Sequence, residues 1–211
     1  MQAFTRKLWD KQNQHPGDRG RLFAAVGRAI DADTALYPGS YVDVAASFVF
    51  PSVTYVDSDE RAARFFSDRA GVDAIIAQHA WNPREHSWAF IGGDYTADLG
   101  LRDTRFDLLI SLYAGFVSEA CDRYLRPGGW LLVNPSHGDA AIASLDPRYR
   151  LVGVVRSRSG DYSVSDRNLD GYLIPKRDVE VSRDLIHEVG RGIGYTRSPF
   201  AYVFQLEVAE Y

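Results

Sequence analysis

Short, almost continuously apolar runs recur along this chain and alternate with stretches of helical spacing. The runs "LLISLY" (residues 108–113) and "WLLVN" (residues 130–134) lack the polar–apolar alternation of a strand that has one face in water. Strands of this kind are buried on both faces, as in a parallel sheet that is covered by helices. Because βαβ units build such sheets, the pattern predicts an α/β domain.

The other elements are predicted from the same two patterns. Strands are expected at residues 34–38, 53–57, 88–94, 149–155 and 200–208. Helices are expected at residues 21–30, 40–50, 58–71, 72–80, 116–125 and 181–193, with a shorter one around Phe4 and Leu8. Pro51 is expected to stop the second of these helices. The helix at 116–125 is expected to end in "LRPGG", where Pro127 and Gly128 turn the chain back into the sheet.

Composition narrows the class of protein. With 211 residues, 45% of them apolar and 25% charged, the chain suits one globular domain. Its formal charge of −4 opposes a broad basic face for a nucleic-acid backbone. The lone Cys121 excludes an internal disulfide framework, and no Cys/His cluster has zinc-ligand spacing, so no metal is predicted. No apolar run is long enough for a bilayer and the N-terminus is too polar for a signal peptide, which predicts a cytoplasmic protein.

The loop "PGSYVD" after the first predicted strand is the first candidate binding element. Gly39 lets a ligand approach the main chain closely, and Ser40 and Asp43 have the spacing of a capping box that would start a helix. The free N–H groups of that first turn would favour a carboxylate or phosphate. The alternative is a plain strand–turn–helix corner. The G-x-G-x-x-G run of dinucleotide-binding proteins is absent, which argues against NAD or FAD.

Two acids follow at the ends of later predicted strands. Asp57 is placed to accept hydrogen bonds from both hydroxyls of a ribose. Its competing role is structural, because Asp57 or Ser58, with Glu60 nearby, could cap the next helix. Asp94 repeats the arrangement after "WAFIGG", where a carboxylate could meet an adenine amino group.

Residues 34–155, and more loosely the final strand, resemble the class I S-adenosylmethionine-dependent methyltransferases. The resemblance rests on "YPGSY", on the acids of "YVDSD" and "GGDY", and on "FDLLISLYAGFVSEACDRYLRPGGWLLVN", in the order that the family has them. It implies a three-layer Rossmann-like sandwich with a mostly parallel seven-stranded sheet and an antiparallel C-terminal strand. Because no linker splits the chain, a single domain is expected over residues 1–211: N-terminal helices (1–33), a cofactor-binding core (34–155), an insertion on the substrate side (156–199) and a final strand (200–211).

The resemblance assigns a binding role to particular residues of this chain. Tyr37, Gly39 and Ser40 would lie along the methionine part of S-adenosylmethionine, Asp57 and Ser58 at the ribose, Asp94 and Tyr95 at the adenine, and Ser111, Leu112 and Tyr113 on the floor of the site. The sequence departs from the family in its glycine loop, which has a single glycine preceded by a tyrosine and a proline.

Methyl transfer from a sulfonium needs alignment of donor and acceptor in a dry site more than it needs a strong base. If the reaction uses a base, the candidates are His137, Tyr113 and His15, with His137 best placed at the carboxyl end of a predicted strand. The alternative for His137 is an ordinary loop histidine.

The predicted function is S-adenosylmethionine-dependent methyl transfer to a small-molecule acceptor. The alternative is a non-catalytic domain of the same fold that binds a nucleoside or a partner protein, and a nicotinamide-dependent oxidoreductase is a third reading that the missing glycine run counts against. Neither a nucleic acid nor a membrane is an expected partner, and a homodimer is left open.

Overall fold

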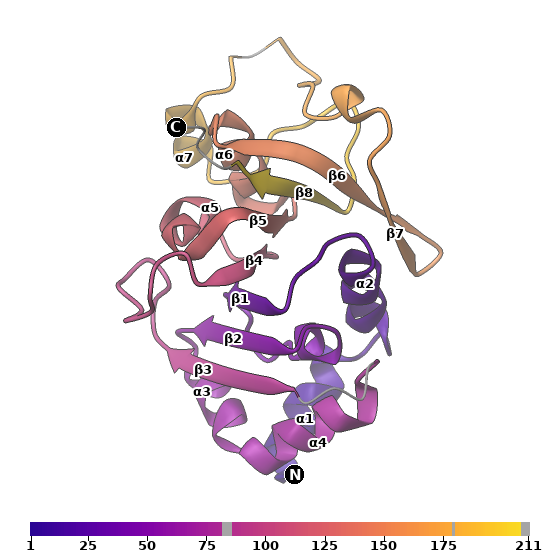
Figure 1. The fold of residues 1–211 in the computed structure, drawn as a ribbon, viewed down its shortest axis with the longest axis vertical. Helices are drawn as coiled ribbons and strands as arrows, with labels where there is room; N and C mark the ends of the chain where they lie inside the picture. The colour runs from indigo at the N-terminus through magenta and orange to yellow at the C-terminus, as the bar shows by residue number, and fades with distance from the viewer. Residues whose placement is uncertain (82–85, 179, 208–211) are drawn as a thin grey trace.

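The computed structural model describes residues 1–81, 86–178 and 180–207. Within these residues, eight strands form one sheet in the order β3-β2-β1-β4-β5-β8-β6-β7 (Figure 1). The strands are β1 Thr34–Pro38, β2 Ser52–Asp57, β3 Ser87–Gly92, β4 Phe106–Ser111, β5 Leu125–Val133, β6 Tyr149–Arg158, β7 Asp161–Ser165 and β8 Ala201–Leu206. Strands β1 to β5 are parallel, and β8 is antiparallel to both of its neighbours, β5 and β6.

Helices cover both faces of this sheet. The α-helices are α1 Ala3–Gln12, α2 Asp18–Gly27, α3 Glu60–Ser67, α4 Arg69–His79, α5 Val117–Ala120, α6 Asp139–Leu145 and α7 Arg183–Val189. Short 3-10 helices are η1 Ala45–Phe48, η2 Asp122–Tyr124, η3 Ser136–Gly138 and η4 Leu169–Gly171. Helices α1 to α4 lie beside the β1–β3 half of the sheet, whereas α5, α6 and α7 lie beside the β5–β8 half (Figure 1).

Strand β1 contributes side chains to two of the apolar cores of the described residues. Its alternating side chains point to opposite faces, because successive residues of a strand do so. Ala35 and Tyr37 belong to the core that also holds Phe23 of α2, while Leu36 belongs to the core that also holds Val117 of α5. The predicted three-layer Rossmann-like sandwich, mostly parallel with an antiparallel C-terminal strand, is thus confirmed.

The sheet has one strand more than the seven expected. Strand β7 ("DYSVS") forms a hairpin with β6 at the edge of the sheet and packs on α2. There the Tyr162 hydroxyl donates to Asp18, and Arg21 donates to the Gly160 carbonyl. Polar edge residues hide this strand from a search for apolar runs.

The helix predicted at residues 40–50 is wrong, since the structure has a loop followed only by η1. Tyr41 takes a left-handed conformation (φ 50°), which a helix does not allow. The Asp43 side chain accepts from the Ala45 N–H, and the Tyr55 hydroxyl donates to the Val44 carbonyl. Side chains therefore use backbone groups that a helix would need.

The long helix predicted at residues 116–125 is also wrong, because α5 and η2 replace it and β5 already begins at Leu125. The Arg123 and Tyr124 carbonyls accept the N–H groups of Thr104 and Arg105, so they pair with the chain that enters β4. Consequently "LRPGG" does not end a helix. It forms the first part of β5, next to a register shift between Phe106 and Leu108 of β4.

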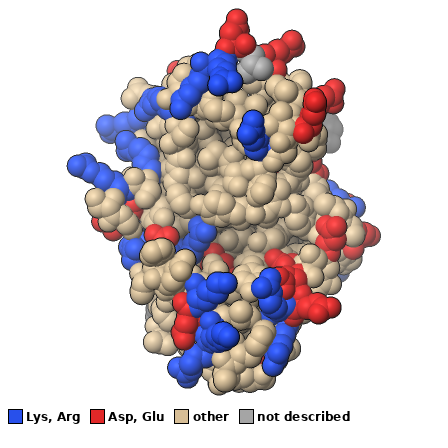
Figure 2. Space-filling model, turned by 180° about the vertical axis from the view of Figure 1, so that it is seen from behind, with Lys and Arg blue, Asp and Glu red and all other residues tan. Residues whose placement is uncertain are grey.

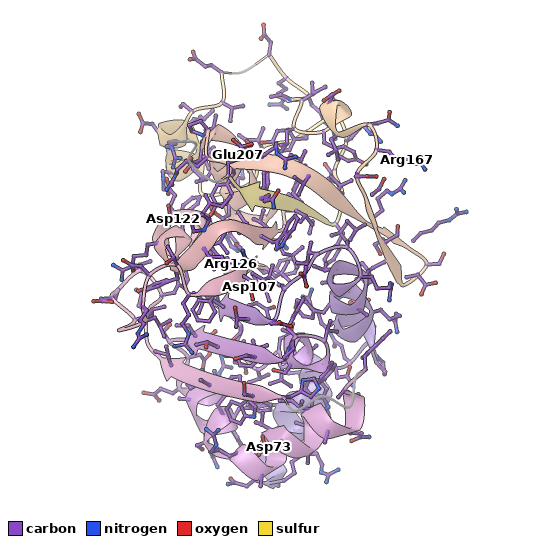
Figure 3. All side chains as sticks on the ribbon, viewed as in Figure 1. Asp73, Asp107, Asp122, Arg126, Arg167 and Glu207 are labelled. Carbon is purple, nitrogen blue, oxygen red and sulfur yellow. The ribbon has the colours of Figure 1, made fainter. Side chains whose placement is uncertain are left out.

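The amino-terminal ends of the central strands are joined by one carboxylate. Asp107 accepts hydrogen bonds from the Thr34 N–H and hydroxyl, and its other oxygen pairs with Arg126 of β5 at 2.5 Å. Figure 3 shows Asp107 and Arg126 side by side near the middle of the sheet. This contact ties β1, β4 and β5 together near their amino-terminal ends.

The last four residues of the predicted final segment, 208–211, lie outside the described residues. None of the helices in the described part of the chain has the length and apolarity to cross a lipid bilayer.

Candidate functional site

A cavity of about 340 Å³ lies at the carboxyl ends of β1 and β4. Ligands of open α/β sheets bind at this edge, and the volume lies in the range of small-molecule sites. Its lining residues come from the α1–α2 turn, the glycine loop, the loop after β4 and the segment before β8: Lys11, Gln12, Asn13, Gln14, His15, Asp18, Arg19, Tyr41, Tyr113 and Phe200. We call this space the edge cavity.

The packing around position 39 leaves no room for a side chain larger than that of glycine. Its N–H donates to the Val56 carbonyl at 2.8 Å, and its φ of 64° lies in the left-handed region. A Cβ atom at this position would lie 2.3 Å from the Cβ of Ala114, in the loop after β4. The close approach of two protein loops therefore accounts for Gly39 without a ligand.

Ser40 does not start a helix, so the predicted capping box is wrong. The Asp43 N–H donates to the Ser40 carbonyl, and no helix begins there. The Ser40 side chain is 3% exposed, and its hydroxyl has no hydrogen-bond partner among the described residues. A buried hydroxyl without a partner is costly, and such groups often await a water or ligand.

Asp57 holds the glycine loop from the end of β2. Its carboxylate accepts the Tyr41 N–H at 2.7 Å and the Asp59 N–H at 2.8 Å. The competing cap role predicted for Asp57 or Ser58 is wrong, because Asp59 caps α3 by accepting the Arg61 N–H. A carboxylate has about four acceptor positions, so partly exposed Asp57 keeps capacity for further donors. Ser58 beside it is exposed.

Asp94 and Tyr95 follow β3. Asp94 is exposed and accepts the Thr96 N–H at 2.9 Å, a bond that lowers the pKa of its carboxyl. The Tyr95 hydroxyl donates to the Ala114 carbonyl, and burial raises its pKa to about 12. Tyr95 therefore supports the loop after β4, whereas Asp94 stays accessible to a ligand.

The residues that end β4 point in different directions. Ser111 is buried and donates to Asp139 of α6, and Leu112 is buried in the core. Tyr113 takes a left-handed conformation (φ 63°) and is 53% exposed at the edge cavity. Its N–H donates to the Asn134 side chain at 3.2 Å. Of the predicted floor of the site, Tyr113 alone lines the edge cavity.

A buried charge network lies next to this cavity. Tyr37 is 2% exposed, and its hydroxyl donates to Asp43 at 3.1 Å. Asp43 also pairs with Arg19 of α2 at 3.4 Å, and the Arg19 guanidinium lies 5.3 Å from the centre of the Tyr113 ring. Burial and the neighbouring Asp43 raise the pKa of Tyr37 well above its usual value. Tyr37 is thus a structural donor, and Arg19 links the glycine loop to the exposed tyrosine.

The three candidate bases do not all lie in the same space. His137 is exposed in η3 with φ 58°, and it does not line the edge cavity. His15 and Tyr113 both line it. Among the three candidates, the structure therefore brings His15 and Tyr113 to one space and leaves His137 outside it.

Arg19 and Asp139 are not among the site residues that the sequence predicts. Asp139 is 1% exposed and accepts from the hydroxyls of Ser111 and Ser118 and from the Ser118 N–H. Burial raises its pKa to about 6, against the lowering effect of these hydrogen bonds. No local signal connects residues 19 and 43, or 111 and 139, because each pair meets only in the folded chain. The described residues contain no group of three or more His, Cys, Asp and Glu side chains that could hold a metal ion.

Comparison with known proteins adds information on the fold. The chain matches no protein-family model, and no curated protein matches it significantly. A putative O-methyltransferase from Klebsiella pneumoniae is similar over 78% of this chain and 88% of its own, with a TM-score of 0.50 and 13% identity. An O-methyltransferase from Bacillus cereus in complex with SAH is similar over 78% and 89%, with a TM-score of 0.48 and 11% identity. The first of these likenesses shows that the chain has the Rossmann-like fold of class I methyltransferases, so the predicted resemblance is confirmed for the fold.

Proposed function

We propose that this chain binds S-adenosylmethionine and transfers its methyl group to a small-molecule acceptor. The observation that carries the proposal is the edge cavity, which opens between the glycine loop and Tyr113 at the carboxyl ends of β1 and β4. This is the edge at which sheets of this fold class bind their ligands. The fold shared with a putative O-methyltransferase supports the same reading.

The residues that we propose for the nucleoside end of the cofactor lie at the carboxyl ends of β2 and β3, outside the lining of the edge cavity. Asp57 retains acceptor capacity for two ribose hydroxyls, with exposed Ser58 beside it, and exposed Asp94 suits an adenine amino group. The Ser40 hydroxyl is itself buried, so we assign Ser40 to the glycine loop that borders the site and not to a direct contact with the bound molecule. Tyr37, Tyr95 and Ser111 already donate to protein acceptors, so we assign them a supporting role under the site. Gly39 and Leu112 complete that support.

When bound, S-adenosylmethionine supplies an electrophilic methyl group. The chain itself has to orient the acceptor and keep water away from the reacting atoms. Tyr113 and Phe200 offer aromatic surface for this purpose, and the α1–α2 turn covers the cavity with Arg19 held by Asp43. Where the acceptor is a hydroxyl, His15 is the group in the cavity suited to take its proton. His137 becomes the weaker candidate because it lies outside the cavity.

We further propose that residues 1–211 act as one domain in which segments 1–33 and 156–199 form the acceptor side. The lining of the edge cavity by the α1–α2 turn supports this for the N-terminal segment. Charged side chains of both signs lie around the rim of the face in Figure 2, with a broad uncharged surface between them. This distribution and the net charge of −4 favour a small acceptor over a nucleic acid. A cytoplasmic location and a homodimer stay predictions.

Calorimetric titration with S-adenosylmethionine, S-adenosylhomocysteine and NADH tests the proposal. We expect both sulfur nucleosides to bind and NADH not to bind. Asp57→Ala should weaken the binding of the sulfur nucleosides at least about tenfold, because hydrogen bonds to a carboxylate are lost.

Asp59→Ala is the matched control, because it removes a carboxylate two residues away that caps α3. The affinity of this variant for the sulfur nucleosides should stay within about twofold of the wild type. Absence of sulfur-nucleoside binding at millimolar concentration would refute the proposed function, and an unchanged affinity of Asp57→Ala would refute the ribose assignment.

A further inference from the structure

A second cavity lies on the same edge of the sheet, beside the edge cavity. It is lined by Arg156, Ser157, Tyr172, Arg197, Ser198, Pro199 and Phe200. Phe200 lines both spaces, so the two cavities adjoin at this residue. We call this second space the arginine cavity.

The strand order explains why the two cavities are neighbours. Strand β8 runs antiparallel to β5, so its start lies beside the carboxyl end of β5, with Val133 paired to Tyr202. Strand β6 runs antiparallel to β8, so its end lies there as well, with Val155 paired to Ala201. Residues 156–158 and 197–200 therefore continue the edge at which β1 and β4 end.

Two guanidinium groups dominate the arginine cavity, and no carboxylate of the described residues lines it. Several other arginines of the described chain have acidic partners, for example Arg126 with Asp107 and Arg148 with Asp146. Among the ion pairs of the described residues, neither Arg156 nor Arg197 has such a partner. In a chain of net charge −4, this leaves a local positive site next to the proposed acceptor.

Arg197 is also held in place before any ligand arrives. Its guanidinium lies 4.2 Å from the centre of the Tyr172 ring, and one of its NH2 groups donates to the Tyr172 hydroxyl at 3.2 Å. A second contact runs to the Asn168 carbonyl at 3.4 Å. Tyr172 is itself buried, so it is a fixed platform. A guanidinium has five N–H donors in a planar fork, so donors remain for an anion.

We propose that the arginine cavity binds a carboxylate or phosphate group of the methyl acceptor, which would place the rest of that molecule past Phe200 in the edge cavity. Both groups accept two parallel hydrogen bonds from an arginine, and the hydroxyls of Ser157 and Ser198 can add further donors. This assignment of substrate class rests on the proposed methyltransferase function. The acceptor is then a small anionic molecule.

Titration of the full chain with phenyl phosphate, benzoate and uncharged benzamide, without S-adenosylmethionine, tests the proposal. We expect the two anions to bind at least about tenfold more tightly than benzamide and to weaken with added salt. The tighter of the two anions identifies the preferred group. Arg197→Gln and Arg156→Gln should each weaken anion binding at least about tenfold, while Arg197→Lys should keep part of it because the charge remains.

Arg158→Gln is the matched control, because Arg158 is an exposed arginine on β6 that does not line the arginine cavity. It removes the same charge and should leave the anion affinity within about twofold of the wild type. Equal binding of benzamide and benzoate, or equal effects of Arg158→Gln and Arg156→Gln, would overturn the proposal. If S-adenosylmethionine fails to bind while the anions bind in this arginine-dependent way, the proposed function falls and the anion site stands.

Discussion

At the scale of single residues, most hydroxyl groups around the candidate site already have hydrogen-bond acceptors in the protein. Tyr37, Tyr95 and Ser111 all donate to protein acceptors, while the Ser40 hydroxyl has no partner in the described part of the chain. Hydroxyls that already have acceptors gain little from a ligand, and the Ser40 hydroxyl is buried away from one. Gly39 likewise serves the contact between two loops.

Gly39→Ala tests that contact. Gly100 has nearly the same φ (65°), and a Cβ atom added there would have no neighbouring atom within 4 Å, so Gly100→Ala measures backbone strain alone. We expect Gly100→Ala to cost about 1 kcal/mol of unfolding free energy. Gly39→Ala should cost about 1–3 kcal/mol more, because its methyl group meets Ala114.

Urea denaturation of both variants gives the comparison. The double variant Gly39→Ala with Ala114→Gly should recover part of the difference, because it removes the atom that clashes. Equal costs for the two single variants would show that Ala114 does not explain the glycine.

At the scale of secondary-structure elements, Asp139 connects β4, α5 and α6. Its carboxylate accepts from Ser111 at the end of β4 and from Ser118 in α5, while it stands at the start of α6. Because the loop that carries Tyr113 runs between Ser111 and Ser118, this buried contact fixes both ends of that loop.

The raised pKa of Asp139 predicts a pH dependence of stability. Burial raises the pKa to about 6 in the folded chain, against an ordinary value of 3.8, so the folded state favours the protonated form. The resulting stabilisation is complete below pH 3.8 and is lost as the pH rises through about 6, with a size of roughly 3 kcal/mol.

Asp139→Asn isolates this effect from the other acids. The asparagine keeps an acceptor for Ser118 and cannot ionise. We expect the difference in unfolding free energy between the variant and the wild type to grow in favour of the variant as the pH rises from about 4 to about 7, as measured by urea denaturation. A difference that does not change with pH would contradict a raised pKa.

At the scale of the whole molecule, α2 and the β6–β7 hairpin meet beside the edge cavity. Strand β7 packs on α2, where the Tyr162 hydroxyl donates to both oxygens of Asp18 at 3.0 and 3.1 Å. Asp18 also lines the edge cavity. Residues that are far apart in the sequence therefore hold the α1–α2 turn above the site.

Tyr162→Phe tests this long-range contact, and Tyr202→Phe is its control. The Tyr202 hydroxyl is buried without a hydrogen-bond partner among the described residues. We expect Tyr162→Phe to lower the unfolding free energy by about 1–2 kcal/mol, because a hydrogen bond to a carboxylate is lost. Tyr202→Phe should be neutral or slightly stabilising, since it removes a polar group that has no acceptor. Thermal denaturation of the two variants compares them, and a larger loss for Tyr202→Phe would contradict the assignment.

The elements that the sequence predicted well are those with strong local patterns. Strands β1, β2 and β4 lie where their apolar runs predicted them, and the run at residues 130–134 covers the second half of β5, because a buried strand needs apolar residues on both faces. The helix predicted at residues 40–50 failed because Tyr55 and Asp43 take its backbone groups, and that competition depends on contacts between the loop and other parts of the sheet and helices.

The sequence by itself determined the α/β class, the positions of the first strands and the acids that follow them. These properties are local, since apolar periodicity and strand-end residues can be read in windows of a few residues. Only the tertiary structure decided that Arg19 meets Asp43 and Tyr113, that Asp139 meets Ser111, and that Arg156 and Arg197 share a cavity. Each of these contacts joins segments whose distance along the chain carries no pattern, so the folded sheet alone brings their charges together.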